Sequence, residues 1–229
     1  MNRQIAVIAG PTAVGKTKFA IEAARALDGE IISCDSMQLY RYMDIGSAKP
    51  TPEEMAQAVH HLVDVIDPSQ PFSAAMYQKM AKEAIEEVFS RGKLPIISGG
   101  TGLYLNTLIY DMDFSGADRD DRLRLELEEE ARANGPEVLH RRLEELDQDA
   151  AERIHPNNVK RVIRALEGAL TGHNIRDFRE CISKCKDYDI NLIILSRNRE
   201  ELYDRINKRV DILVQEGLFE EVDCLMSKG

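Results

Sequence analysis

The sequence predicts an α/β fold, with a parallel sheet flanked by helices and an all-helical insertion. Short apolar runs alternate with segments of helical spacing, which is typical of βαβ units. A glycine-rich loop joins the first apolar run to the first helical segment. A densely charged stretch with apolar residues at helical intervals then interrupts this alternation. We therefore expect residues 1–113 and 189–229 to form the α/β core and residues 114–188 to form the insertion.

The glycine-rich loop has the spacing G-x-x-x-x-G-K-[ST] of a phosphate-binding P-loop. The apolar run before it, residues 5–9, is typical of a buried strand, and residues 17–27 have apolar side chains at helical spacing. This context of strand, loop and helix is the one that the motif requires, so we expect a P-loop NTPase-like sheet. A glycine-rich turn without a ligand is the alternative. The predicted diphosphate-binding loop consists of Gly10, Pro11, Thr12, Ala13, Val14, Gly15, Lys16 and Thr17.

The chemistry of this loop favours a diphosphate ligand. Gly10 and Gly15 allow the backbone to turn its N–H groups inward, and the helix that follows adds the positive end of its dipole. Lys16 supplies a charge for phosphate oxygens, and Thr17 supplies a hydroxyl for Mg²⁺. A P-loop does not, however, identify the group that carries the diphosphate.

Two further segments are expected at the same edge of the sheet. Residues 30–36 read as a second strand that ends at Asp35, and ligands of open α/β sheets bind at the carboxyl ends of strands. Asp35 is therefore a candidate for holding Mg²⁺ through water or for acting as a base, with capping of the next turn as the alternative. Residues 94–104 read as strand, glycine loop and helix, which predicts a second anion site near Thr101. This strand does not end in a Walker B carboxylate, which disfavours ATP hydrolysis.

The composition limits the class of protein. The 229 residues are 43% hydrophobic, as in an ordinary globular protein, and contain no apolar run of about 20 residues that could span a membrane. A strand pattern starts within a few residues of the N-terminus, so we expect no secretory signal and a cytoplasmic location. Cysteines are too few for a disulfide framework, and Cys181 with Cys185 lacks the partner pair of a zinc site, so free thiols are expected.

The net charge of −10 disfavours non-specific nucleic-acid binding by the chain as a whole, but one local patch is basic. Lys160, Arg161 and Arg164 share one face of a predicted helix because they are three and four residues apart. Acidic residues are scarce between residues 153 and 179. This pattern is typical of a contact with a phosphate backbone. Ordinary salt bridges to the acidic part of the insertion are the alternative, and charge alone does not separate the two.

A second pair of basic residues lies near the end of the chain. Residues 200–228 have a helical pattern with a break at Gly217, and Arg205 and Arg209 lie four residues apart on it. Arginine binds diphosphate oxygens well, so both are candidates for the P-loop ligand. Pairing with Glu201 and Asp204 is the alternative.

Taken together, these motifs resemble the tRNA dimethylallyltransferase family, also called tRNA isopentenyltransferases. The similarity runs through nearly the whole chain and follows the order of the family's motifs. The matching segments are residues 10–17, 35–40, 43–50, 99–104, 155–157 and 161–167. The family pattern continues past residue 229 with more helix and a basic C-terminal part that this sequence lacks. Residues 111–118 and 172–188 are short or unusual for the family.

The resemblance implies transfer of a dimethylallyl group from dimethylallyl diphosphate to the N6 amine of the adenosine 3′-adjacent to the anticodon in tRNA, with release of pyrophosphate. It implies Mg²⁺ as the cofactor, Asp35 as the general base and extrusion of the adenosine from its stack. The implied catalytic residues are Asp35, Thr12, Lys16 and Thr101. The implied tRNA-binding residues are Asp35, Ser36, Met37, Gln38, Thr101, Arg122, Lys160, Arg161, Val162, Ile163 and Arg164. We expect a monomer that binds the anticodon stem-loop and dimethylallyl diphosphate, and no membrane.

Other functions fit parts of the same pattern. A P-loop kinase for a small molecule or nucleotide would bind and turn over ATP. A prenyltransferase for a free adenine nucleotide would not need the basic face around Lys160. A third possibility is a non-catalytic RNA- or nucleotide-binding module that retains the P-loop. In such a module, Asp35→Ala would change only the affinity for the ligand.

Overall fold

The computed structural model describes residues 3–110, 112, 120–172 and 185–228. The chain divides into two compact units, Met1–Met112 with Ser183–Gly229 and Asp113–Ile182. The second of these units corresponds to the helical insertion that the sequence predicted at residues 114–188. No helix in the described part of the chain is both long and apolar enough to cross a bilayer.

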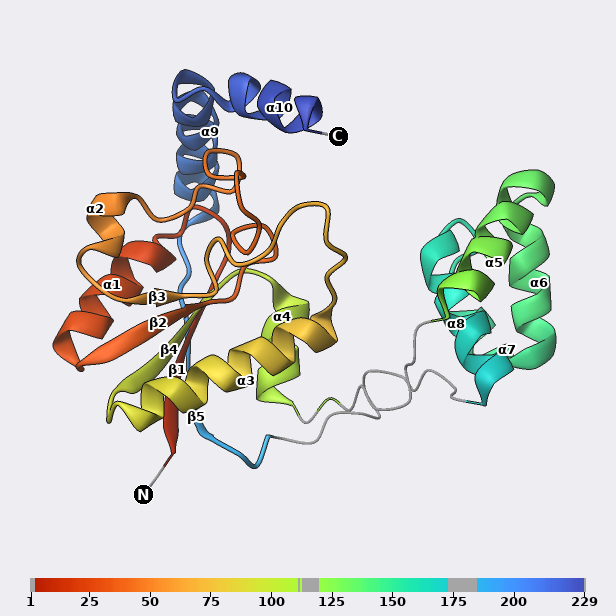
Figure 1. The fold of residues 1–229 in the computed structure, drawn as a ribbon, viewed down its shortest axis with the longest axis horizontal. Coiled ribbons are helices and arrows are strands. Elements are labelled where there is room, and N and C mark those ends of the chain that lie inside the picture. Colours follow the sequence, from red (N-terminus) through yellow and green to blue (C-terminus); the bar gives the residue numbers. More distant parts are fainter. Residues whose placement is uncertain (1–2, 111, 113–119, 173–184, 229) are drawn as a thin grey trace. The chain divides into compact units, whose positions relative to one another are not determined.

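The first unit is built on a five-stranded parallel sheet with the strand order β3-β2-β4-β1-β5 (Figure 1). The strands are β1 (Gln4–Ala9), β2 (Gly29–Ser33), β3 (His60–His61), β4 (Leu94–Gly99) and β5 (Asp189–Ile194). The helices of this unit are α1 (Lys16–Ala26), α2 (Pro52–Met55), α3 (Ala74–Ser90), α4 (Gly102–Ile109), α9 (Arg199–Gln215) and α10 (Leu218–Ser227). The predicted P-loop NTPase-like fold class is confirmed, and Gly217 divides the last helical segment as predicted.

The inner strands β1, β2 and β4 are mostly buried, because helices cover both of their faces, whereas the edge strand β5 is largely exposed. In β1, Ile5 and Val7 belong to the core that includes α3 and α4, whereas Ala6 and Ile8 belong to the core that includes α1. This alternation follows from the two-residue period of a strand.

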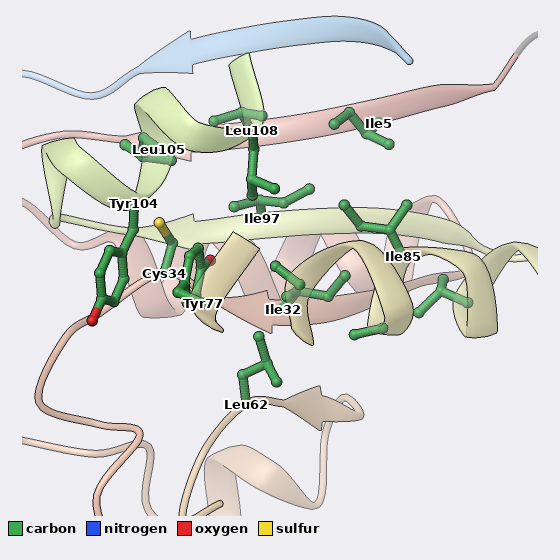
Figure 2. Close-up of a cluster of buried hydrophobic side chains, with 14 of the residues drawn as sticks. Ile5, Ile32, Cys34, Leu62, Tyr77, Ile85, Ile97, Tyr104, Leu105 and Leu108 are labelled. Carbon is green, nitrogen blue, oxygen red and sulfur yellow. The ribbon is translucent and has the colours of Figure 1, made fainter. Parts of the chain in front are cut away.

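The larger core also fixes the carboxyl end of β2 (Figure 2). The rings of Tyr77 from α3 and Tyr104 from α4 stack with their centroids 4.1 Å apart. The Tyr77 hydroxyl donates a hydrogen bond to the Ser33 carbonyl over 3.1 Å. Burial raises the pKa of the neighbouring Cys34 thiol to about 12, so this cysteine packs as an inert core residue. Cys34, Cys185 and Cys224 are free thiols, as predicted, and Cys181 lies outside the described residues.

The second unit is helical, with α5 (Asp121–Asn134), α6 (Pro136–Leu146), α7 (Gln148–Arg153) and α8 (Val159–Thr171). Its apolar side chains form a separate core that includes Leu127, Leu139, Leu143 and Leu166. The buried Glu167 carboxylate on α8 is held by the Arg124 guanidinium of α5, with an Nη2–Oε2 distance of 2.6 Å. This pair ties the first and last helices of the unit together.

A second buried carboxylate, Glu30, lies at the amino end of β2 and is 3% exposed. Arg91 donates to it from Nε over 3.1 Å and from Nη2 over 2.8 Å, and His61 Nε2 lies 2.7 Å from its Oε2. These hydrogen bonds, with that from Arg91 the largest cause, lower the pKa of Glu30 to about 2. Glu30 therefore links β2, β3 and the end of α3.

We predict that Glu30→Gln destabilises the protein at neutral pH. The folded-state pKa of about 2 is below the ordinary 4.5, so the stabilisation is complete above pH 4.5 and is lost as the pH falls toward 2. A shift of this size corresponds to about 3 kcal/mol. Thermal unfolding should give a lower midpoint for the variant at pH 7 than for the unsubstituted protein, and the gap should narrow at pH 3. The matched control is Glu22→Gln on an exposed face of α1; an equal loss there, or a gap that does not depend on pH, would contradict the prediction.

Candidate diphosphate-binding site

The P-loop connects β1 to α1 at the carboxyl end of the sheet. Gly15, the residue before α1, has φ 107°, a conformation that L side chains rarely adopt. Lys16 starts the helix, and its ammonium donates to the Gly10 carbonyl over 3.0 Å and to the Pro11 carbonyl over 2.9 Å. The loop thus curls around the Lys16 ammonium.

The second glycine loop, which follows β4, lies against the same lysine. A Cβ on Gly99 would fall 2.0 Å from the Cys34 carbonyl oxygen, so only glycine allows the ends of β4 and β2 to approach this closely. A Cβ on Gly100 would lie 3.6 Å from Lys16 Nζ. The structure therefore brings the two glycine loops together, at the edge of the sheet where the sequence predicted both of them.

Thr101 and Ser36 join the second loop to the segment after β2. The Thr101 hydroxyl oxygen accepts a hydrogen bond from the Ser36 amide over 2.9 Å and lies 3.3 Å from the Ser36 hydroxyl. The Thr101 amide in turn donates to the Cys34 carbonyl over 3.2 Å. Thr101 thus holds the segment that carries Asp35 against the glycine loop.

Asp35 takes the capping role that the sequence gave as the alternative, and its role as a base or as a Mg²⁺ ligand stays a prediction. Its Oδ1 accepts hydrogen bonds from the amides of Met37, over 2.9 Å, and Gln38, over 3.4 Å, so it caps the turn. The carboxylate also interacts electrostatically with Lys16. The pKa of Lys16 is lowered, chiefly because burial penalises its charge; Asp35 opposes this shift and Arg209 adds to it. Asp35 and Arg209 are therefore both within electrostatic range of the Lys16 ammonium.

Two arginines, one on α9 and one just before it, donate hydrogen bonds to P-loop carbonyls. Arg205 Nε donates to the Ala13 carbonyl over 2.7 Å, and Arg197 Nε donates to the Val14 carbonyl over 2.9 Å. In a trans peptide group the N–H points away from the C=O. The N–H groups that share a peptide group with these two carbonyls therefore point away from the arginines. Arg205 thus lies beside the P-loop, and the prediction that Arg205 and Arg209 bind the diphosphate itself stays a prediction.

Sequence reasoning missed Arg197. This residue precedes α9 by two positions, so helical spacing could not group it with Arg205 and Arg209. Its Nη1 pairs with Glu201, the carboxylate that the sequence offered as a partner for the two predicted arginines. A basic residue between an apolar strand and a helix start was the only available signal.

The turn after β2 presents one exposed side chain and one anchored side chain. Met37 is 46% exposed. The Gln38 side chain accepts from the Ser33 hydroxyl over 3.0 Å and donates to the Ala48 carbonyl over 3.2 Å. The side-chain amide of Gln38 thus links the end of β2 to the loop that contains Ala48. Met37 is the exposed side chain of this turn.

In the helical unit, the three predicted basic residues of α8 are exposed. Within the described ranges, none of Lys160, Arg161 and Arg164 forms an ion pair, so the structure does not support the alternative of salt bridges to the acidic helices. Arg122, which was predicted to join them, pairs instead with Glu126 one turn along α5 over 3.1 Å. Among the described residues, the basic face of α8 therefore has no acidic partner.

The prediction that Val162 and Ile163 contact tRNA is wrong for their side chains. Val162 is 0% exposed and Ile163 is 4% exposed, because both lie on the side of α8 that packs into the helical core. An amphipathic helix buries one side and exposes the other, so a stretch of five residues such as 160–164 contributes side chains to both. Their role is to seat α8 so that Lys160, Arg161 and Arg164 face solvent.

Comparison with known proteins supports a single family. The sequence model described as IPP transferase matches residues 38–229. The tRNA dimethylallyltransferase of Alkaliphilus oremlandii is 52% identical over 230 aligned positions, which cover 100% of this chain and 74% of that protein. The protein of the same name from Clostridioides difficile is 49% identical over 223 positions, covering 97% and 72%.

Solved structures give the same result. The full-length tRNA isopentenylpyrophosphate transferase of Bacillus halodurans matches with a TM-score of 0.68 and 44% identity, covering 100% of this chain and 71% of that one. A eukaryotic dimethylallyltransferase captured acting on tRNA matches with a TM-score of 0.84 and 30% identity, covering 99% and 56%.

We predict that Lys16→Ala weakens the binding of inorganic pyrophosphate by about tenfold or more, because a charge-assisted contact in a partly buried loop is lost. Isothermal titration in the presence of Mg²⁺ measures the affinity. Lys18→Ala removes the same charge from the exposed face of α1 and is the control. Equal affinities for the two variants would remove Lys16 from the diphosphate site.

Proposed function

The chain belongs to the tRNA dimethylallyltransferase family, also called the IPP transferase family, and from this membership we propose its reaction. It transfers the dimethylallyl group of dimethylallyl diphosphate to the N6 amine of the adenosine 3′-adjacent to the anticodon in tRNA, and it releases pyrophosphate. The observation that carries the proposal is the meeting of two glycine loops, Asp35 and Arg209 around the Lys16 ammonium. This site combines diphosphate binding with a carboxylate and lacks a Walker B acid at the end of β4.

The proposed step exchanges one bond for another. The amine nitrogen forms a bond to the allylic carbon while the bond from that carbon to the diphosphate oxygen breaks, and the electron pair leaves with pyrophosphate. Lys16 and the inward N–H groups of the P-loop stabilise the negative charge that develops on the leaving group. Thr12, which is exposed on the loop, and Thr101 are proposed to bind diphosphate oxygens or to orient the amine.

Asp35 is proposed as the base that accepts the amine proton. Its two turn hydrogen bonds both use Oδ1, and no hydrogen bond within the described residues uses Oδ2. The backbone of the turn therefore fixes the carboxylate while one oxygen stays available for the proton. Met37 and Ser36 of the same turn are proposed to contact the extruded base.

The residues present fit Mg²⁺ bound mainly by the substrate. Among the described residues there is no group of three or more histidine, cysteine, aspartate or glutamate side chains that could hold a metal ion. Mg²⁺ keeps waters and favours substrate phosphates with one or two protein oxygens, and we propose the Thr17 hydroxyl as that protein ligand. When bound, the ion neutralises charge on the departing pyrophosphate.

The helical unit is proposed to bind the anticodon stem-loop through the basic face of α8. Three exposed cations within two turns of one helix suit successive phosphates, which position an RNA without reading its sequence. We further propose that the protein acts as a monomer in the cytoplasm.

The test of this function is pyrophosphate release from dimethylallyl diphosphate with Mg²⁺, with and without an anticodon stem-loop that bears the adenosine. We expect release to depend on the RNA and labelled prenyl to appear on it. Free adenine nucleotide and ATP are the comparison substrates. Transfer to the free nucleotide, or turnover of ATP without prenyl transfer, would replace the proposal by one of those activities.

We predict that Asp35→Asn lowers single-turnover prenyl transfer by about 100-fold or more, the range of a lost general base, while pyrophosphate binding persists. Asparagine keeps an Oδ1 that can cap the turn, so the change tests the proton acceptor and not the fold. Asp67→Asn is the control, since Asp67 also caps a turn, through the Ser69 amide, outside the site. Transfer at the unsubstituted rate would end the assignment of Asp35 as base.

We predict that Lys160→Glu with Arg164→Glu weakens binding of the stem-loop and lowers the salt slope of binding by about 2, one unit for each lost phosphate contact. Arg132→Glu with Arg141→Glu makes the same charge change on exposed positions of α5 and α6 and is the control. Filter binding across a salt series measures both quantities. An unchanged slope would exclude the α8 face from the RNA site.

A further inference from the structure

A carboxylate of α10 occupies a nest of backbone amides in the loop that follows the Asp35 turn. Glu221 Oε2 accepts hydrogen bonds from the amides of Asp44 and Ile45, both over 2.7 Å, and Oε1 accepts from the Gly46 amide over 2.9 Å. Successive N–H groups that converge on one point form a strong anion site. Three hydrogen bonds to one charged group make this contact a fixed clamp.

Contacts on both sides of the clamp hold α10 on the same loop. A Cβ on Gly46 would lie 3.1 Å from Leu218 Cδ1, and a Cβ on Gly217 would lie 3.8 Å from Ile45 Cδ1. At the other end of the helix, Lys228 Nζ lies 3.6 Å from the ring centroid of Tyr42. The docking of α10 thus spans the loop, with Glu221 in the middle.

The loop itself is tied together by a buried lysine. The Lys49 ammonium donates to the Tyr40 carbonyl and to Asp44 Oδ1, both over 2.6 Å, and also pairs with Asp64. The Lys49 side chain is 5% exposed. Both ends of the segment from Asp44 to Lys49 are therefore anchored, and the amide nest lies within this anchored segment.

This segment reaches the proposed site through Gln38. The side-chain Nε2 of Gln38 donates a hydrogen bond to the Ala48 carbonyl over 3.2 Å. The backbone N–H of Gln38 donates a hydrogen bond to Asp35 Oδ1 over 3.4 Å. Hydrogen bonds and short stretches of covalent backbone therefore link Glu221, through residues 44–48 and Gln38, to the carboxylate proposed as base.

We propose that Glu221 is a positioning residue for the RNA side of the reaction. It clamps residues 44–46 and so holds Gln38 and Asp35 in the geometry that receives the adenosine. The inference rests on the proposed function. The hydrogen bonds of Glu221 all go to this loop, whereas Arg197 and Arg205 support the P-loop, so the diphosphate and RNA sides of the site have separate supports.

The test compares Glu221→Ala with Glu220→Ala, which removes the same charge from an exposed neighbour on α10. For Glu221→Ala we expect kcat/KM for the stem-loop to fall by about tenfold or more, with the affinity for dimethylallyl diphosphate unchanged. Glu221→Gln keeps one acceptor oxygen and should recover part of the activity; it also serves if the alanine variant does not fold. Equal RNA kinetics in the Glu221 and Glu220 variants, or a parallel loss of diphosphate affinity, would overturn the proposal.

Amide hydrogen exchange separates this inference from the proposed function. Peptides that cover residues 35–48 should exchange faster in Glu221→Gln than in Glu220→Ala, and this readout needs no turnover. Unsubstituted protein that transfers no prenyl group would refute the function alone. Unchanged exchange in these peptides would refute the positioning role whether or not the protein is active.

Discussion

The site depends on the close approach of the carboxyl ends of β1, β2 and β4. Parallel register pairs Ala9 with Gly99 and Ser33 with Ser98, so the segments after these strands start side by side. Gly99 permits this approach because any side chain there would overlap the Cys34 carbonyl. The P-loop, the second glycine loop and the Asp35 turn meet at Lys16 as a direct consequence.

Positive charge gathers around the P-loop in a chain whose net charge is −10. Burial lowers the pKa of Lys16, and Arg209 adds to this effect, while Asp35 opposes it. A diphosphate would add negative charge to a partly buried, cation-rich site, where Coulomb attraction is stronger than in bulk water. The buried carboxylates Glu30 and Glu167 are each paired with an arginine of their own unit, so they act as structural links within those units.

Each part of the proposed site has its own support. Arginines that precede or lie on α9 orient the P-loop carbonyls, and Glu221 on α10 holds the loop that leads to Asp35. Both helices come from the end of the chain and lie on the α/β unit. The end of the described chain therefore supports both halves of the site through hydrogen bonds to backbone atoms. Such bonds fix the path of each loop whatever side chains the loop carries.

The sequence by itself determined the fold class, the P-loop, the second glycine loop and the family, because glycine spacing, apolar runs and helical periodicity are local properties. It also determined that Lys160 and Arg164 share a face. Only the tertiary structure decided which way single side chains point. Val162 and Ile163 are buried because the face they occupy packs into the helical core. Arg197 and Glu221 reach backbone atoms more than 170 positions away, as shown by separations of 183 and 177 residues, and no local pattern encodes such contacts.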